Sequence, residues 1–249
     1  MKKILLFLGI LFLSSSLFAE KISVFVASSA SKAMNEVKDE FLKEHKNDEV
    51  ELVFGASGKY YQILKQGREF DLFFSADTKY AKQIADDQNA ITEPKVYVLG
   101  VVALYSLDEN LLKGGVEELG KKLDKINHLS IANSKVAPYG VAATQVLEKL
   151  NLNKALDGKI VLGDNISQPV VHVDNGVAEL SIVAYSLVSQ VNNPKGKAVI
   201  VDSKYFSPLE QSFVVTKYAK NKPLAMEFSN FISSPKAKEI FKKYGFDTP

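Results

Sequence analysis

The sequence predicts an α/β protein with two lobes, each a mostly parallel sheet flanked by helices. First, apolar β-runs alternate with amphipathic helical runs along the chain, an alternation typical of parallel sheets covered on both faces. Second, about ten β-runs are too many for one ordinary sheet. Third, the β-run 95–106 is longer than one typical strand, as expected for a segment that crosses from one lobe into the other.

Lobe I is expected to begin with residues 20–100. Its first helical run repeats apolar residues at Met34, Val37 and Phe41, which is helical spacing. In chain order the expected elements are strand 21–26, helix 31–45, strand 49–54, helix 58–67, strand 71–74 and helix 78–87. Each strand therefore leads directly into a helix, and the connecting turns should meet at one edge of the sheet.

Lobe II is expected to cover residues 101–207. Pro138 opens one of its helices, and Pro169 lies in the first turn of the next, where proline is well tolerated. Its expected elements are strand 129–132, helix 138–150, strand 159–162, helix 167–175 and strands 180–185 and 198–202.

Residues 208–249 are expected to return to lobe I. They contain a β-run, 211–216, and two closing helices. The second helix starts at Ser234-Pro235 and stops at Gly245, which are typical start and stop signals.

Residues 1–19 have the pattern of a secretory signal peptide. Lys2 and Lys3 precede an apolar stretch, and Ala19 is a suitable cleavage position. The chain contains no cysteine, which excludes disulfides, zinc–thiolate sites and a lipid anchor on cysteine. Without the two lysines the chain has 29 basic and 29 acidic residues. We therefore expect a neutral, exported protein that binds no nucleic acid.

Two serine-rich turns stand where a strand ends and a helix begins. The first is Ala27-Ser28-Ser29-Ala30-Ser31 and the second is Gly55-Ala56-Ser57-Gly58-Lys59. Free backbone N–H groups and the positive end of the helix dipole meet at such places, which suits an anion. Two turns of lobe II, 137–140 and 165–168, are expected at the same cleft.

Other interpretations of these residues remain open. The serines are also common helix caps. Ser57 with its flanking glycines departs from the hydrolase pattern Gly-x-Ser-x-Gly, because Lys59 replaces the last glycine. Tyr60 and Tyr61 could hold ferric iron, although one buried and one exposed ring is the more ordinary arrangement. The three histidines show no metal-ligand spacing.

Taken together, these turns resemble those of the periplasmic molybdate-binding proteins that serve ABC importers. The resemblance rests on the two serine turns, on 71–77, on the two lobe II turns and on the closing Lys243-Tyr244-Gly245-Phe246. It covers essentially the whole chain after the predicted signal peptide. It implies the two-lobe periplasmic binding protein fold of type II, with the ligand in the cleft between the lobes.

The resemblance also implies an oxyanion site. It places Ser29 and Ser57 on the two ligand serines, which would donate through their hydroxyl groups, and it places Tyr139 and Ile166 where backbone N–H groups contact the ligand. Ser28, in the first turn, is a further candidate for the site. The implied ligand is molybdate or tungstate, held without a protein side chain bound directly to the metal, and no cofactor is implied. The implied partner is an inner-membrane ABC permease, and the protein is expected to be a monomeric periplasmic protein rather than an enzyme.

One position departs from the family pattern. Some members use a tyrosine hydroxyl from the strand that corresponds to 180–185, but here Ala184 falls at that position and Tyr185 follows it. Successive strand side chains face opposite ways, so Tyr185 is not expected in the site, and Tyr139 is one candidate to fill the space.

The ligand class follows from the donors. Serine hydroxyls and backbone N–H groups can donate to a tetrahedral dianion that carries no proton. The sole arginine, Arg68, lies beyond the second helix, so the guanidinium clamp of many carboxylate and phosphate sites is not expected. The residues alone leave sulfate, another oxyanion or ferric iron as alternatives, together with an exported serine hydrolase.

Overall fold

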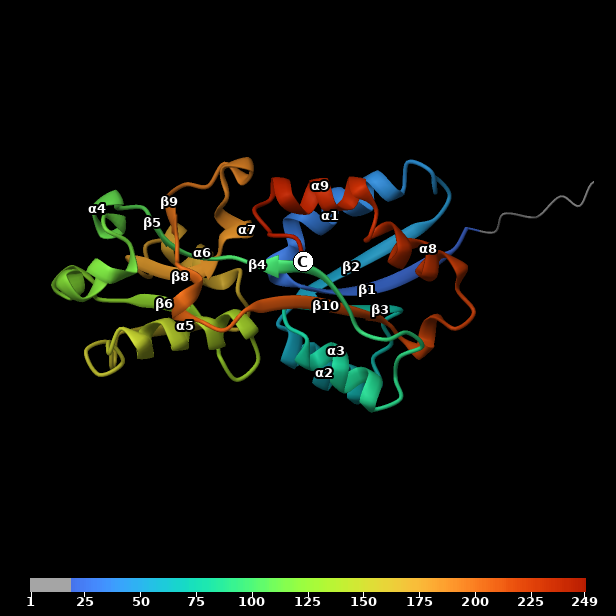
Figure 1. Ribbon diagram of the computed structural model, residues 1–249, viewed down its shortest axis with the longest axis horizontal. Helices are drawn as coiled ribbons and strands as arrows, with labels where there is room; N and C mark the ends of the chain where they lie inside the picture. Colours follow the sequence, from blue (N-terminus) through green and yellow to red (C-terminus); the bar gives the residue numbers. More distant parts are fainter. Residues whose placement is uncertain (1–18) are drawn as a thin grey trace, which may run out of the picture.

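The computed structural model describes residues 19–249, and these form two lobes side by side along the long axis of the molecule (Figure 1). The predicted signal peptide lies outside the described residues except for Ala19. Among the described helices, none combines the length and apolar character needed to cross a membrane.

Lobe I is built on a five-stranded sheet of order β2-β1-β3-β10-β4. Its strands are β1 (Lys21–Ala27), β2 (Glu49–Gly55), β3 (Leu72–Ser75), β4 (Lys95–Gly100) and β10 (Leu209–Val215). β1, β2 and β3 are parallel, and β10 runs antiparallel to both of its neighbours. The sheet is therefore mixed, with β10 as its single reversed strand.

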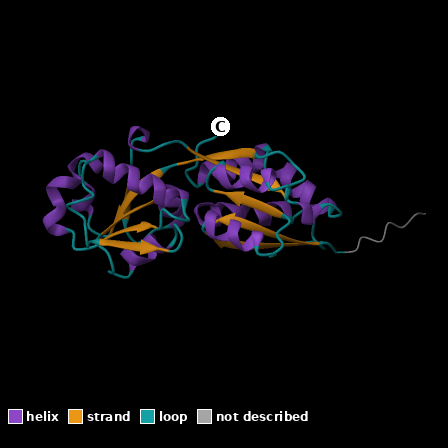
Figure 2. Ribbon diagram, turned by 90° about the horizontal axis from the view of Figure 1, so that it is seen from below, coloured by secondary structure: helices purple, strands orange, loops and turns teal. Residues whose placement is uncertain are grey.

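Helices cover both faces of this sheet (Figures 1 and 2). Alternate β1 residues such as Val24 pack in one core with α1, α8 and α9, whereas Phe25 packs on the opposite face with α2 and α3. The lobe I helices are α1 (Ser31–Phe41), α2 (Ser57–Lys65), α3 (Lys79–Asp86), α8 (Pro223–Phe231) and α9 (Pro235–Lys243), preceded by a short 3₁₀ turn η1 (Ser28–Ala30). This double-sided burial explains the nearly continuous apolar sequence of β1 and β3.

Lobe II repeats the plan with the order β7-β6-β8-β5-β9. β6, β7 and β8 are parallel, and β5 runs antiparallel to β8 and β9. Its strands are β5 (Val102–Ser106), β6 (Leu129–Ala132), β7 (Ile160–Gly163), β8 (Leu180–Ala184) and β9 (Lys197–Ile200). Its helices are α4 (Glu109–Leu112), α5 (Pro138–Lys149), α6 (Gln168–Asp174) and α7 (Tyr185–Val188). The predicted α/β fold of two sheets flanked by helices is confirmed.

The chain crosses between the lobes twice. The first crossing corrects the sequence prediction of one strand over 95–106: β4 ends at Gly100, β5 starts at Val102, and Val101 lies between them. The backbone leaves one sheet and enters the other there, so one continuous strand cannot satisfy both ladders. The second crossing is the segment 201–208 between β9 and β10. Each reversed strand, β5 or β10, is thus the first strand after a crossing.

The lobes touch along the strand ends. Ala27, Ala56 and Ala76 follow or end β1, β2 and β3, and they pack with the apolar core of lobe II. A backbone hydrogen bond of 2.9 Å also runs from Gly58 N at the start of α2 to Val136 O before α5. Small residues at these three lobe I turns allow the two lobes to approach this closely.

Candidate functional site

Five turns, three from lobe I and two from lobe II, surround a small cavity between the lobes. Its lining includes Ser28 and Ser57 from lobe I and Tyr139 and Ile166 from lobe II. The cavity has a volume of about 10 Å³, close to the space of one water molecule by the same measure. The structure therefore brings together four of the five residues that the sequence assigned to an oxyanion site.

These four residues are closed off from solvent. Relative exposure is 3% for Ser28, 0% for Ser57, 1% for Tyr139 and 4% for Ile166. Polar groups buried to this degree need hydrogen-bond partners, because an unpaired donor loses its contact with water.

Their backbone N–H groups lack such partners. Among the described residues, none accepts a hydrogen bond from the backbone N–H of Ser28, Ser57, Tyr139 or Ile166. The side chains at the preceding positions supply no cap either, at η1, α2 or α5. The same N-terminal position of α9 is capped by the Ser234 hydroxyl, which accepts from Ala237 N at 3.1 Å. The uncapped starts around the cavity thus leave donors for a ligand.

Local sequence explains this arrangement. Alanine precedes each of the three uncapped starts, as Ala27, Ala56 and Ala137, so no cap side chain stands there. In α5 the first position is Pro138, which has no N–H, and Tyr139 carries the first free donor. The strand–turn–helix order then directs each donor to the carboxyl ends of the strands.

The hydroxyl groups of Ser57 and Ser28 form hydrogen bonds with backbone groups of lobe I. Ser57 Oγ accepts from Ala76 N at 3.0 Å, and Ser28 Oγ donates to Gly55 O at 3.2 Å. Neither bond is a helix cap, so the capping interpretation does not describe these two residues. Ser57 Oγ keeps its own proton for a second partner, because its bond to Ala76 uses an oxygen lone pair.

Ser29 does not line the cavity. It is 1% exposed, and its hydroxyl donates to Gln211 Oε1 at 3.1 Å. Its carbonyl accepts from Ser186 Oγ of lobe II at 2.7 Å. Ser29 therefore lies behind the cavity wall and bonds to both lobes.

Sequence reasoning missed Gln211. It lies on β10 with no exposed surface and bonds Ser29. The one signal in the sequence is a glutamine inside a β-run, with the apolar residues Leu209 and Phe213 two positions before and after it. A buried amide on the apolar face of a strand must find polar partners, but the sequence does not reveal which ones.

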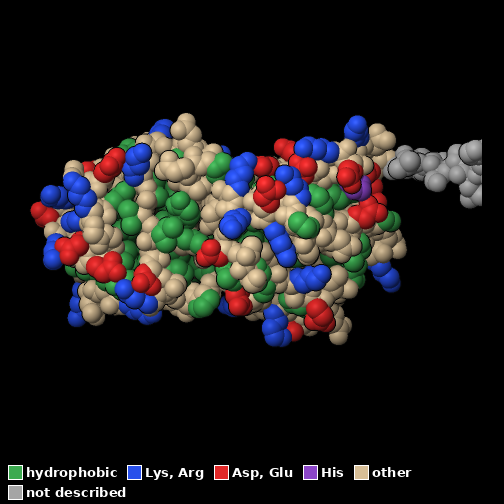
Figure 3. All heavy atoms as spheres, turned by 45° about the horizontal axis from the view of Figure 1, so that its top comes forward, with side chains coloured by type: hydrophobic (Ala, Val, Ile, Leu, Met, Phe, Trp, Pro, Cys, Tyr) green, Lys and Arg blue, Asp and Glu red, His purple; other side chains and the backbone are tan. Residues whose placement is uncertain are grey.

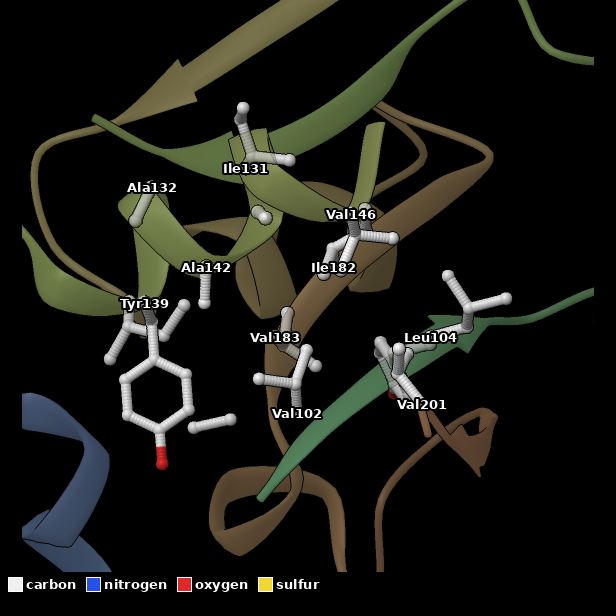
Figure 4. Close-up of a cluster of buried hydrophobic side chains, with 14 of the residues drawn as sticks. Val102, Leu104, Ile131, Ala132, Tyr139, Ala142, Val146, Ile182, Val183 and Val201 are labelled. Atoms are coloured by element: carbon white, nitrogen blue, oxygen red, sulfur yellow. The ribbon is translucent and has the colours of Figure 1, made fainter. Parts of the chain in front are cut away.

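Tyr139 and Tyr185 differ in their surroundings. In the lobe II core, the Tyr139 ring points its hydroxyl out of the apolar cluster (Figure 4). Tyr185 starts α7 and lies beside Gly245, where an added Cβ would come within 2.5 Å of its ring. Tyr185 is not among the cavity residues, in line with the departure noted in the sequence.

Charged side chains stay outside the cavity lining, which in the described chain contains no lysine, arginine or carboxylate. Arg68 stacks over Phe70, 5.6 Å from the ring centroid. A larger groove of about 310 Å³, lined by Asp77, Lys79 and Lys135 among others, opens next to the cavity. On the face shown in Figure 3, basic and acidic side chains are interspersed.

Asp77 is the nearest acid along the chain to the cavity residue Ala76. Burial raises the pKa of its carboxyl above the ordinary value, although hydrogen bonds from Ser75 and from Tyr80 N oppose that shift. Its Oδ1 accepts from Ser75 Oγ at 2.7 Å and from Tyr80 N at 3.2 Å. The Asp77 carboxylate thus accepts hydrogen bonds from its own turn and from the first turn of α3.

The alternative chemistries find no matching geometry. Tyr60 stacks on Phe25 with centroids 4.5 Å apart, while Tyr61 donates to Asp87 Oδ2 at 2.8 Å. The two hydroxyls thus do not form a ligand pair. His172 Nδ1 lies 2.8 Å from Ser130 Oγ, and among the described residues no histidine forms a hydrogen bond with Ser57. The described residues also contain no cluster of three or more His, Cys, Asp or Glu suited to a metal ion.

Comparisons with known proteins agree with this geometry. Residues 22–247 match the family model described as bacterial extracellular solute-binding protein. The molybdate-binding protein ModA of Azotobacter vinelandii is 32% identical over 99% of this chain and 97% of its own length. ModA of Rhodobacter capsulatus is 33% identical over 80% of this chain and 77% of its own.

Structural similarity points the same way. The solved periplasmic molybdate-binding protein of Azotobacter vinelandii matches with a TM-score of 0.84 and 28% identity, over 92% of this chain and 99% of that one. These relatives are binding proteins, not enzymes. With its two-lobe fold and its enclosed cavity, the chain belongs to the bacterial extracellular solute-binding proteins, in the group that contains the ModA molybdate-binding proteins.

Proposed function

We propose that this protein captures molybdate or tungstate in the periplasm and delivers it to an ABC importer of the inner membrane. The observation that carries the proposal is the set of buried backbone N–H groups without partners at Ser28, Ser57, Tyr139 and Ile166. The relatives named for molybdate binding support the choice of ligand.

The donor set suits a tetrahedral dianion without protons. Such an ion only accepts hydrogen bonds, and uncharged N–H and O–H groups only need to donate. Hydrogen bonds to a charged acceptor contribute about 1.5–3 kcal/mol each before the costs of ordering and desolvation. A handful of them is enough for sub-micromolar affinity. The Ser57 hydroxyl can add a donor from its own proton.

The cavity size sets a condition on binding. A five-atom oxyanion needs more room than the cavity of about 10 Å³ provides, so the lobes must separate to admit it. The two crossings at Val101 and at 201–208 provide the hinge for that motion. A ligand held by donors of both lobes then stabilises the closed arrangement.

Isothermal titration calorimetry with molybdate, tungstate, sulfate and phosphate tests the proposal. We expect tight binding of molybdate and tungstate and much weaker binding of sulfate and phosphate. Phosphate should be weakest, because its proton needs an acceptor and the lining holds no carboxylate. Equal or tighter binding of sulfate would contradict the proposed specificity.

The transport role needs a second test. The protein, without its predicted signal peptide, should behave as a monomer and should stimulate ATP hydrolysis by its cognate permease complex only when molybdate is present. Stimulation without any oxyanion would contradict delivery by the loaded protein.

A further inference from the structure

The buried amide of Gln211 is the centre of a hydrogen-bond network behind the cavity. Its Oε1 accepts from Ser29 Oγ at 3.1 Å and from Tyr97 OH at 3.2 Å. Its Nε2 donates to Tyr139 OH at 3.1 Å. The residue has no exposed surface, so each of these bonds replaces one with water.

The three hydrogen-bond partners of Gln211 lie in three elements that would take part in closing the lobes. Ser29 follows Ser28 in the first lobe I turn, and Tyr97 lies on β4, the strand that leads into the first crossing. Tyr139 lies in the first turn of α5 in lobe II, where its backbone lines the cavity. The bond from Gln211 to Tyr139 therefore joins the lobes directly, from the strand that follows the second crossing.

Gly100 makes room for this contact. A Cβ at this position would lie 2.4 Å from Tyr139 OH and 3.0 Å from Gln211 Nε2. No other residue type fits there without displacing the tyrosine. The Tyr139 hydroxyl thus packs against Gly100, the last residue of β4, and accepts a hydrogen bond from the Gln211 amide on β10.

Both tyrosine hydroxyls keep their protons. Burial raises the pKa of Tyr97 and of Tyr139 far above the ordinary value. Tyr97 is therefore a neutral phenol that donates to Gln211, and the network carries no charge next to the cavity.

We propose that Gln211 is a positioning residue for oxyanion binding: it holds the Ser29 side chain behind the first lobe I turn and orients Tyr139 of lobe II, so that the backbone N–H groups of Ser28 and Tyr139 face the same cavity. This inference rests on the proposed function. Without the amide, Ser29 and Tyr139 lose the group that orients them, and the closed arrangement loses a bond between lobes.

The test compares Gln211→Leu and Tyr139→Phe with the control Tyr105→Phe. Gln211→Leu keeps a side chain of similar size but removes the hydrogen bonds to Ser29, Tyr97 and Tyr139. Tyr139→Phe removes only the hydrogen bond between Gln211 and Tyr139, which joins the lobes. Tyr105 is a matched control in lobe II, because it also has no exposed surface. Its hydroxyl donates to Asp174 Oδ1 at a distance of 2.6 Å, and the residue does not line the cavity. Affinity for molybdate and for sulfate is measured by calorimetry, and the melting temperature is measured without ligand.

We expect Gln211→Leu to weaken the binding of molybdate at least tenfold and Tyr139→Phe to weaken it severalfold. The double variant should bind no more weakly than Gln211→Leu, because leucine already removes the bond to Tyr139. Tyr105→Phe should lower the melting temperature and leave the affinity within twofold of the unaltered protein.

Two failures can be told apart. If the unaltered protein binds neither anion, or prefers sulfate, the proposed function fails. If it binds an anion and both Gln211→Leu and Tyr139→Phe bind that anion within twofold of it, the role of Gln211 is overturned. Should Gln211→Leu not fold, the Tyr139→Phe result alone decides, since that variant leaves Gln211 paired with Ser29 and Tyr97.

Discussion

At the scale of single residues, Ser57 serves both the fold and the cavity. Its oxygen accepts from Ala76 N, and its proton remains for a ligand. Ser57→Ala should weaken molybdate binding by about 1–3 kcal/mol and should also lower the unfolding free energy by about 1–3 kcal/mol, because Ala76 N loses its acceptor. Calorimetry and urea denaturation measure the two effects separately.

The control for this prediction is Ser229→Ala. Its hydroxyl donates to Met226 O at 2.8 Å within α8, and the residue does not line the cavity. This change should affect stability alone. If Ser57→Ala binds molybdate as tightly as the unaltered protein, Ser57 contributes no bond to the ligand.

Asp77 gives a pH-dependent prediction. Burial raises its pKa in the folded protein, so its ionisation disfavours the folded state as the pH rises from the ordinary value of 3.8 through the higher folded value. Asparagine keeps an oxygen that can accept from Ser75 and from Tyr80 N, without the charge. The stability of Asp77→Asn relative to the unaltered protein should therefore increase between pH 3.5 and pH 7.

Urea denaturation at several pH values measures this difference. A difference that stays constant over the range, or that falls with rising pH, would show that the Asp77 carboxyl is not held in an unfavourable charged form. Above the folded pKa the difference should become constant, since the carboxyl is then ionised in both states.

At the scale of elements, the start of α2 depends on a glycine. A Cβ at Gly58 would lie 2.4 Å from Tyr80 OH and 3.0 Å from Val136 O of lobe II. Because backbone atoms of the other lobe cannot yield as easily as a side chain, Gly58→Ala should push the lobes apart. We expect a loss of about 1–3 kcal/mol in the binding of molybdate, as for other overpacked sites.

Gly120→Ala is the control for this change. Its Cβ would meet the Leu152 side chain at 3.4 Å, an ordinary contact in lobe II. Calorimetry should find its affinity for molybdate unaltered. Equal affinities for Gly58→Ala and Gly120→Ala would show that the lobes do not need the close approach at α2.

Elements with strong local signals were predictable from sequence. The turn 55–59 places a hydroxyl residue between glycines after a β-run, and Pro138 opens α5. The break at Val101 was not predictable, because 95–106 has uniform β character and the interruption results from joining two sheets. Gln211 was missed for a related reason: its partners are distant in sequence, and only tertiary structure brings them together.

At the scale of the whole molecule, two crossings and one shared cavity predict a hinge motion. Small-angle X-ray scattering should give a smaller radius of gyration with saturating molybdate than without it, because in the proposed binding mode the ion contacts donors of both lobes. Sulfate at the same concentration is the control and should produce a smaller change. Identical scattering curves with and without molybdate would contradict closure on the ligand.

The two-lobe architecture itself follows from the sequence more readily than the contact between lobes. The alternation of β-runs and helical runs indicates sheets covered by helices on both faces, and about ten such β-runs indicate two sheets rather than one. How closely the lobes approach depends on Ala27, Ala56 and Ala76, whose small size is visible in the sequence but whose packing against lobe II is not. The pairing of Gly58 N with Val136 O is likewise a property of the folded chain alone.

The enclosure of the cavity has a kinetic consequence. Its four named lining residues are at most 4% exposed, so the donors have almost no contact with water while the lobes touch. Escape of a bound ion then waits for the lobes to part, a motion that commonly takes microseconds to milliseconds. The residence time of every trapped ion thus has a lower limit set by the protein. A membrane complex that pulls the lobes apart would shorten that time without altering a single contact to the ion.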